Sequence, residues 1–159
     1  MIVGIDNGLD GGLVAISKHS GVVIEKTVMP TFHRLGKREV DSRMVYEWIT
    51  FLNTPFTIAI EEPLRHARSS QAMRSMAISF GKILGMAECR QWDIKCISVH
   101  KWQKEVLGRV PKGKTKDAAL TVATILAPDE RWQKSKRASK PHDGMIDAYL
   151  IAHYLRKKL

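Results

Sequence analysis

The pattern of apolar and polar positions in the first thirty residues predicts three short strands. Ile2, Val3 and Ile5 form a β-branched run that ends at Asp6, and the glycines that follow permit a tight return. Two further apolar runs, 13–17 and 22–29, are separated by a turn of Lys, His, Ser and Gly. This order favours an antiparallel meander of three strands.

The middle of the chain alternates between helical and strand-like patterns. Residues 30–38 are basic and predict a loop, and apolar positions from 44 to 52 have helical spacing after the candidate N-caps Asp41 and Ser42. Residues 56–60 form a short continuous apolar run that is typical of a strand buried on both faces. Glu61, Glu62 and Pro63 follow this strand, and we expect the proline to end it.

The second half predicts helices separated by one more strand. A long helix is expected over 71–91, a strand over 94–99, a short helix from Val99, a helix over 115–126 and a last helix that begins near His142. Basic loops are expected around 64–70 and over 131–140. Gly81 and Gly85 would allow a neighbour to approach the long helix closely. The fold class is therefore α/β.

Size and composition favour one domain over residues 1–159 with a substantial core. Apolar residues make up 44% of the 159 residues, and no apolar run approaches the length that spans a bilayer. The N-terminus shows no basic segment followed by an apolar one, so we expect a cytoplasmic protein. Cys89 and Cys96 are interpreted as reduced thiols in the core or near the surface.

Basic residues are concentrated in one quarter of the chain. The formal net charge is +10, and residues 101–140 hold eleven basic and four acidic residues. Such concentration indicates a surface that binds a polyanion. The alternative is a basic face that is merely solvated. Membrane binding is less favoured, because Gly and Pro interrupt these basic stretches. The candidate contacts to nucleic-acid phosphates are Arg65, Arg68, Arg74, Lys101, Lys104, Lys112, Lys114, Lys116, Lys136 and Arg137.

Four carboxylates occupy positions that could meet in space. Asp6 ends the first strand, and strand alternation favours Glu61 over Glu62 as the acid that points the same way. Asp143 and Asp147 are four residues apart, and hence on one face of the last helix. Carboxylate oxygens suit Mg²⁺ or Mn²⁺. A plain turn at Asp6, a cap at Asp143 and a surface role for Asp147 are the structural alternatives.

Three motifs in this order resemble the RuvC family of Holliday-junction resolvases, within the ribonuclease H-like fold. The motifs are GIDNG around Asp6, IAIEEP around Glu61 and HDGMIDAYLIA from His142, and the last looks like the phage and prophage branch. The resemblance implies a mixed five-stranded sheet flanked by helices. It also implies that Asp6, Glu61, Asp143 and Asp147 hold two Mg²⁺ or Mn²⁺ ions.

The same resemblance implies hydrolysis of branched DNA, the Holliday junction above all, that leaves 5′-phosphate and 3′-hydroxyl ends. Family members act as homodimers, and the apolar stripe of the 71–91 helix is the candidate dimer element, with burial inside one chain as its alternative. A bacterial or phage-infected cytoplasm is the implied location. The chain departs from the family pattern at Gly144. In better-known members the last two acids are three residues apart, whereas here the position three residues before Asp147 is a glycine. This departure leaves open whether Asp143 or His142 completes the site, and Glu62 is a further candidate ligand.

Other functions fit parts of the pattern. A related ribonuclease H-like nuclease could act on forks, flaps or RNA, and composition does not separate these substrates. The glycine-rich segment after Asp6 also resembles the first phosphate loop of the actin and sugar-kinase group, although 159 residues leave no room for the duplicated domain of that group. A DNA-binding module without catalysis is disfavoured, because four acids would weaken phosphate binding.

Overall fold

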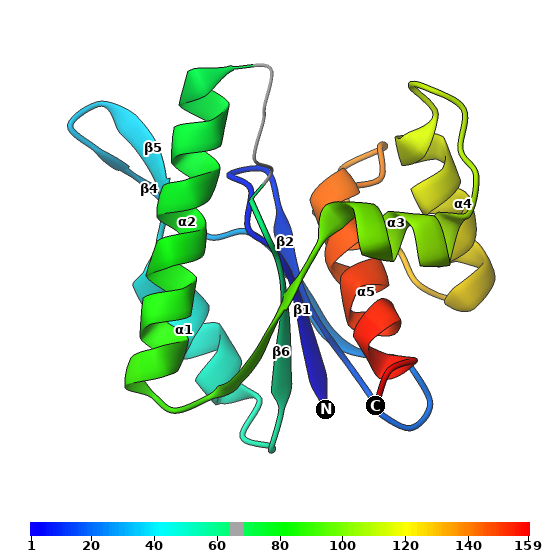
Figure 1. Ribbon diagram of the computed structural model, residues 1–159, viewed down its shortest axis with the longest axis horizontal. Coiled ribbons are helices and arrows are strands. Elements are labelled where there is room, and N and C mark those ends of the chain that lie inside the picture. Colours follow the sequence, from blue (N-terminus) through cyan, green and yellow to red (C-terminus); the bar gives the residue numbers. More distant parts are fainter. Residues whose placement is uncertain (64–68) are drawn as a thin grey trace.

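A five-stranded sheet lies between two layers of helices in the computed structural model, which describes residues 1–63 and 69–159 (Figure 1). The strands are β1 (Ile2–Asp6), β2 (Gly12–Ile16), β3 (Val23–Val28), β4 (Thr31–Arg34), β5 (Lys37–Val40), β6 (Thr57–Glu61) and β7 (Asp93–Ile97). The helices are α1 (Ser42–Phe51), α2 (Ser70–Cys89), α3 (Val99–Leu107), α4 (Thr115–Leu126) and α5 (Asp143–Arg156).

The sheet has the mixed topology that the sequence predicts. Its order is β3-β2-β1-β6-β7, in which β1, β2 and β3 are antiparallel and β6 and β7 run parallel to β1. The predicted antiparallel meander and the five-stranded sheet flanked by helices are therefore confirmed. Because β1 and β6 are parallel neighbours, their carboxyl ends lie side by side at the upper end of the sheet in Figure 1.

Each face of the sheet carries its own apolar core. Val3, Ile5, Ile58 and Ile60 face α1 and α2, whereas the alternate strand positions face the layer of α3, α4 and α5. Figure 1 shows α1 and α2 on the left of the sheet and the other three helices on the right. Strand alternation thus decides which residues of β1 and β6 face α5.

Glycines let α5 approach the sheet closely. A Cβ atom on Gly4 would lie 1.9 Å from the carbonyl oxygen of Ala148, and one on Gly144 would lie 2.4 Å from the carbonyl oxygen of Asp10. Gly144 also forms a backbone bridge with Gly11, in the loop between β1 and β2. The start of α5 is therefore held against the end of β1.

The prediction of a loop over residues 30–38 is wrong. The strands β4 and β5 form a two-stranded antiparallel hairpin in this region. Leu35 and Gly36 make its two-residue turn, with φ values of +49° and +73°. Leucine at positive φ is not a usual turn signal, so no local pattern indicates this hairpin clearly. It projects beside α2 at the upper left of Figure 1.

The remaining elements agree with the predicted ones within a few residues. Asp41 is the N-cap of α1, and its side chain accepts hydrogen bonds from the backbone N–H groups of Arg43 and Met44. Cys89 and Cys96 are free and exposed. Within residues 1–63 and 69–159, no helix has both the length and the apolar composition needed to cross a membrane.

Candidate active site

Asp6 and Glu61 project from adjacent strands toward the same helix layer. Ile5 of β1 is paired with Ile60 of β6, so the residues that follow them stand side by side at the two strand ends. Ile5 and Ile60 face α1 and α2, and alternation turns Asp6 and Glu61 toward α5. Glu62 points the other way and is exposed, and its backbone N–H donates to the carbonyl oxygen of Ile97.

The first turns of α5 bring further acids to this strand end. Asp147 is partly buried; the charge of Asp6 raises its pKa, and its own charge raises the pKa of Glu61. Asp143 is the first residue of α5 and is more exposed. His142 is the N-cap, because its Nδ1 accepts a hydrogen bond of 3.3 Å from the backbone N–H of Met145. Asp143 is therefore not the cap, and the structure brings Asp6, Glu61 and Asp147 together with Asp143 at the margin.

Burial and mutual repulsion favour the protonated forms of these carboxyl groups. Burial and then the charge of Asp6 raise the pKa of Glu61 to about 8, and the same two causes raise the pKa of Asp147 to about 7. The pKa of Asp6 is raised as well, mainly by burial, although the Gly8 N–H opposes this shift. Burial lowers the pKa of His142. Ionising all three acids at once therefore calls for a neighbouring positive charge.

Protein donors occupy several of the carboxylate oxygens. The indole Nε1 of Trp102, which is fully buried in α3, donates to Oε2 of Glu61 at 2.7 Å. The Gly8 N–H donates to Oδ1 of Asp6 at 3.0 Å, and Lys116 of α4 forms an ion pair with Asp143. This pair raises the pKa of Lys116.

Sequence reasoning missed two residues that shape this site. The hydrogen bond of Trp102 to Glu61 joins residues 41 positions apart in the sequence, and no local pattern indicates it. Asn7 is fully buried, and its side-chain N–H₂ donates to the carbonyl oxygen of Glu61 at 3.0 Å. The one signal in the sequence for a role of Asn7 is that this polar residue directly follows Asp6, the acid of β1. Asn7 therefore ties the loop after β1 to the end of β6.

The donor chemistry at this strand end fits a hard divalent cation. All the acids present oxygen, the donor atom that such cations prefer, and a cation would offset the burial and the repulsion that raise the pKa values of Glu61 and Asp147. As they stand, no three His, Cys, Asp or Glu side chains in the described part of the chain are close enough to hold a metal ion together. A metal site with three such ligands would therefore require the carboxylate side chains to draw closer together.

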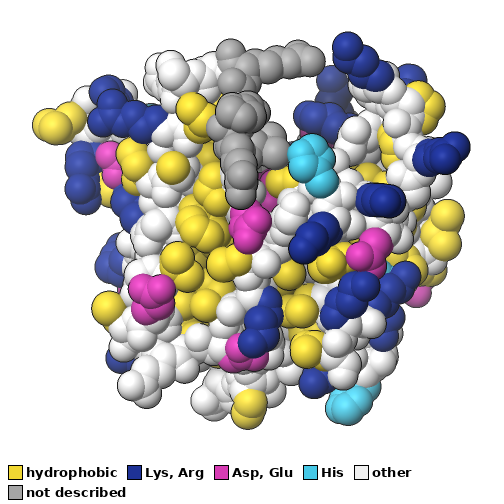
Figure 2. All heavy atoms as spheres, in the orientation of Figure 1, with side chains coloured by type: hydrophobic (Ala, Val, Ile, Leu, Met, Phe, Trp, Pro, Cys, Tyr) yellow, Lys and Arg dark blue, Asp and Glu magenta, His cyan; other side chains and the backbone are white. Residues whose placement is uncertain are grey.

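The predicted phosphate contacts are exposed wherever the structure describes them. Arg65 and Arg68 lie outside the described residues. The others are all exposed: Arg74 in α2, Lys101 and Lys104 in α3, Lys112 and Lys114 before α4, Lys116 in α4, and Lys136 and Arg137 in the loop after α4. Figure 2 shows Lys and Arg side chains over the right side of the molecule and over the hairpin at the upper left.

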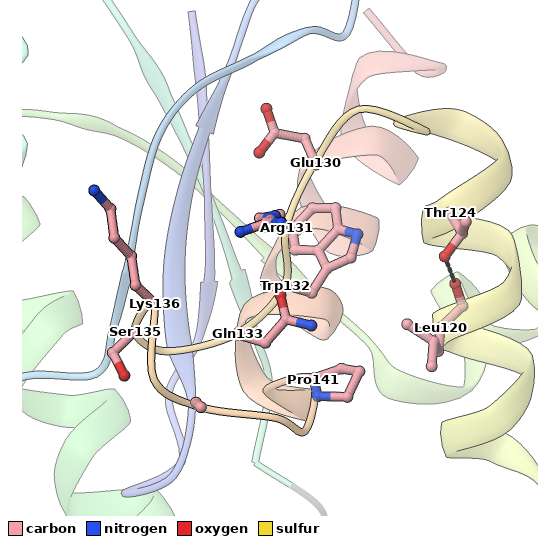
Figure 3. Close-up of a pocket in the computed structure, with 10 residues that line it drawn as sticks. Leu120, Thr124, Glu130, Arg131, Trp132, Gln133, Ser135, Lys136 and Pro141 are labelled. Carbon is pink, nitrogen blue, oxygen red and sulfur yellow. Dashed lines mark hydrogen bonds between the residues drawn. The ribbon is translucent and has the colours of Figure 1, made fainter.

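The basic loop over 131–140 lies against α4 and α5. Trp132 is buried against Tyr149 of α5, with ring centroids 5.0 Å apart, and fixes the loop to the core. A hollow of about 570 Å³ lies between this loop and α4 (Figure 3). Leu120 and Thr124 line it from α4, and Lys136 lines it from the loop. The loop is therefore anchored at Trp132 while its basic side chains stay in solvent.

Comparison with solved structures identifies the fold. The structure of RuvC from Thermus thermophilus superposes with a TM-score of 0.60 at 15% identity, covering 99% of this chain and 95% of that chain. T. thermophilus RuvC in complex with a Holliday junction substrate gives a TM-score of 0.59 at 15% identity, covering 96% and 90%. No family model and no curated protein sequence matches. The chain therefore has the ribonuclease H-like fold of RuvC along nearly its whole length.

Proposed function

We propose that the chain is a divalent-metal-dependent endonuclease that hydrolyses branched DNA, with the four-way junction as its principal substrate. One observation carries the proposal: Asp6, Glu61 and Asp147 lie on one face of the sheet end, where burial, together with repulsion between neighbouring acids, raises their pKa values. The likeness of the fold to RuvC, which has been solved with a Holliday junction substrate, supports the choice of substrate.

Asp6, Glu61 and Asp147 would hold the cations, and Asp143 would complete the ligand set. A pair of Mg²⁺ or Mn²⁺ ions, when bound, supplies charge stabilisation at the scissile phosphate and an acidified water as nucleophile. Trp102 orients Glu61 through its 2.7 Å hydrogen bond, and Asn7 fixes the backbone beside it. His142 keeps its Nδ1 engaged as the helix cap, so it is the weaker candidate for the last ligand. The expected products carry 5′-phosphate and 3′-hydroxyl ends.

Basic side chains on both sides of the carboxylates would hold the DNA arms. Lys112 and Lys114 lie in the connection between α3 and α4, which reaches the same upper end of the sheet as α5 in Figure 1. Such contacts neutralise phosphates without reading bases, so affinity should depend strongly on salt.

A homodimer would place two sites on one junction. Ala77 and Gly81 on α2 are exposed, and a Cβ atom on Gly81 or Gly85 would meet nothing within 4 Å among the described atoms. This open face of small residues supports α2 as the dimer element. Sedimentation of Ala77→Glu tests it: a wild-type dimer and a monomeric variant are expected, and a dimeric variant would exclude this face.

The cleavage test compares purified wild type, Asp6→Asn, Glu61→Gln and Glu62→Gln on a labelled four-way junction, a fork and linear duplex, with Mg²⁺ or with EDTA. Wild type and Glu62→Gln should cut the junction only with Mg²⁺. Asp6→Asn and Glu61→Gln should lose cleavage and bind the junction as tightly as wild type or tighter, because negative charge is removed beside phosphate. Cleavage by either variant at the wild-type rate would refute the site. Preferred cutting of the fork would favour the related nuclease function instead.

A further inference from the structure

The β4–β5 hairpin and the first turns of α2 enclose a groove that the proposed site does not use. Its volume is about 750 Å³. Several cationic and hydroxyl or amide side chains line it: Lys37, Arg38, Ser70, Gln71, Arg74 and Ser75. Leu9, from the loop after Asp6, lines the groove as well, so it opens beside the strand end that carries the carboxylates.

The groove carries positive charge that the fold leaves unpaired. Glu39, the one acid among the described lining residues, already forms an ion pair with Lys82 of α2 at 2.7 Å. Within residues 1–63 and 69–159, neither Lys37 nor Arg74 forms an ion pair with an acid. Both side chains are exposed, as is Arg34 on the facing strand of the hairpin. Figure 2 shows dark blue side chains gathered over this upper left corner.

The hairpin is fixed in place at its base. Arg38 donates from Nη1 to Oδ1 of Asp10 at 2.7 Å and from Nη2 to the carbonyl oxygen of Leu9 at 2.6 Å. On the other side Lys82 donates to the carbonyl oxygen of Val40 at 3.2 Å, in addition to its pair with Glu39. The groove wall is thus tied both to the loop after Asp6 and to α2, so the backbone that carries Lys37 holds a set position relative to the carboxylates.

The outer end of the hairpin contributes nothing to the core. Leu35 at the turn is 96% exposed and has the left-handed backbone conformation that leucine seldom adopts. A projecting, basic hairpin whose tip does not pack on its own chain is suited to contact an external surface. Unpaired Lys and Arg side chains with neighbouring hydroxyl and amide groups are the donors that contact phosphate and sugar in DNA complexes.

We infer that the groove between the β4–β5 hairpin and α2 binds the sugar-phosphate backbone of a DNA arm, with Lys37 and Arg74 as its phosphate contacts. This inference rests on the proposed function and adds a contact surface on the side of the carboxylates opposite α3 and α4. Arg38 is a positioning residue, because its guanidinium is already engaged by Asp10 and Leu9.

The test measures binding of a fluorescent four-way junction by anisotropy in EDTA, at a series of salt concentrations. The groove variant is Lys37→Ala/Arg74→Ala. The matched control is Lys18→Ala/Lys157→Ala, which removes the same charge from exposed residues at the far end of the sheet. The groove variant should bind about tenfold or more weakly near 0.1 M salt, with a log–log salt slope shallower by about 1.8, whereas the control stays within about twofold of wild type.

Two results would overturn the inference while leaving the proposed function standing. In the first, the groove variant and the control bind the junction equally well. In the second, the groove variant keeps its DNA affinity but loses self-association in sedimentation, which would make the groove a contact between copies of the chain. Failure of the wild type to bind or cut any branched DNA would refute the proposed function itself, and cleavage by wild type with Mg²⁺ distinguishes these cases.

Discussion

The indole nitrogen of Trp102 lies 2.7 Å from Oε2 of Glu61 and donates a hydrogen bond to it. This bond opposes the burial that raises the pKa of the carboxyl group. Trp102→Phe should therefore raise the pKa of Glu61 further and move the acidic limb of the Mg²⁺-dependent cleavage profile to higher pH. The pH–rate profile on a four-way junction measures this shift.

The same substitution trims a fully buried side chain, so a loss of stability of about 1–3 kcal/mol is also expected. Trp92→Phe is the control, because Trp92 packs on Tyr46 on the other face of the sheet. It should cost some stability and leave the pH profile in place. An unshifted profile in Trp102→Phe would show that the hydrogen bond does not tune Glu61.

Stability without metal should fall as pH rises. The pKa values of Glu61 and Asp147 are about 8 and about 7 in the folded chain, above the ordinary values of 4.5 and 3.8. At pH values between the ordinary and the raised pKa of each group, the folded state binds more protons than the unfolded state. The free energy of unfolding therefore decreases as the pH increases. In EDTA we expect a loss on the order of 5 kcal/mol between pH 5 and pH 8.5, measured by urea unfolding.

Mg²⁺ should stabilise the chain more at pH 8.5 than at pH 5, because it binds the ionised carboxylates. Glu61→Gln removes one of the titrating groups and should flatten the pH dependence and reduce the effect of Mg²⁺. Equal stabilisation by Mg²⁺ in Glu61→Gln and wild type would place the metal elsewhere.

Gly4 should tolerate no side chain. A Cβ atom there would lie 1.9 Å from the Ala148 carbonyl oxygen, so Gly4→Ala must push α5 away from β1. We expect a loss of about 3 kcal/mol or more in denaturant unfolding, since both elements belong to the core. Gly81→Ala is the control. It lies on the exposed face of α2 with nothing within 4 Å, and at dilutions that prevent self-association it should gain about 0.5–1 kcal/mol. Equal stability of the two variants would contradict the close crossing.

Lys112→Ala/Lys114→Ala should weaken junction binding and flatten its dependence on salt. Both lysines are exposed in the connection before α4, and only Lys114 has an acid nearby, Asp117 at 3.1 Å. Losing two phosphate contacts reduces the log–log salt slope by about 1.8. Titration at four salt concentrations measures it, with Lys18→Ala/Lys157→Ala as the charge-matched control. A slope equal to that of the wild type would remove this connection from the DNA interface.

The sequence predicted the sheet because its strands carry strong local signals. The β-branched run before Asp6 and the buried run before Glu61 both end where polar residues and proline or glycine begin, and alternation alone selected Glu61 over Glu62. The hairpin escaped prediction because its strands are short and charged and its turn uses Leu35 at positive φ. Contacts such as Trp102 with Glu61 and Lys116 with Asp143 join distant segments, so no local pattern encodes them.

The close packing of Gly144 against the loop after β1 limits how the acids of this chain can be spaced. A side chain at position 144 would collide with the backbone of Gly11, so an acid three residues before Asp147 has no room while that loop keeps its course. In this chain the neighbouring position, Asp143, is the nearest one open to a carboxylate. Moving that acid to position 144 would therefore require the loop after β1 to take a different course.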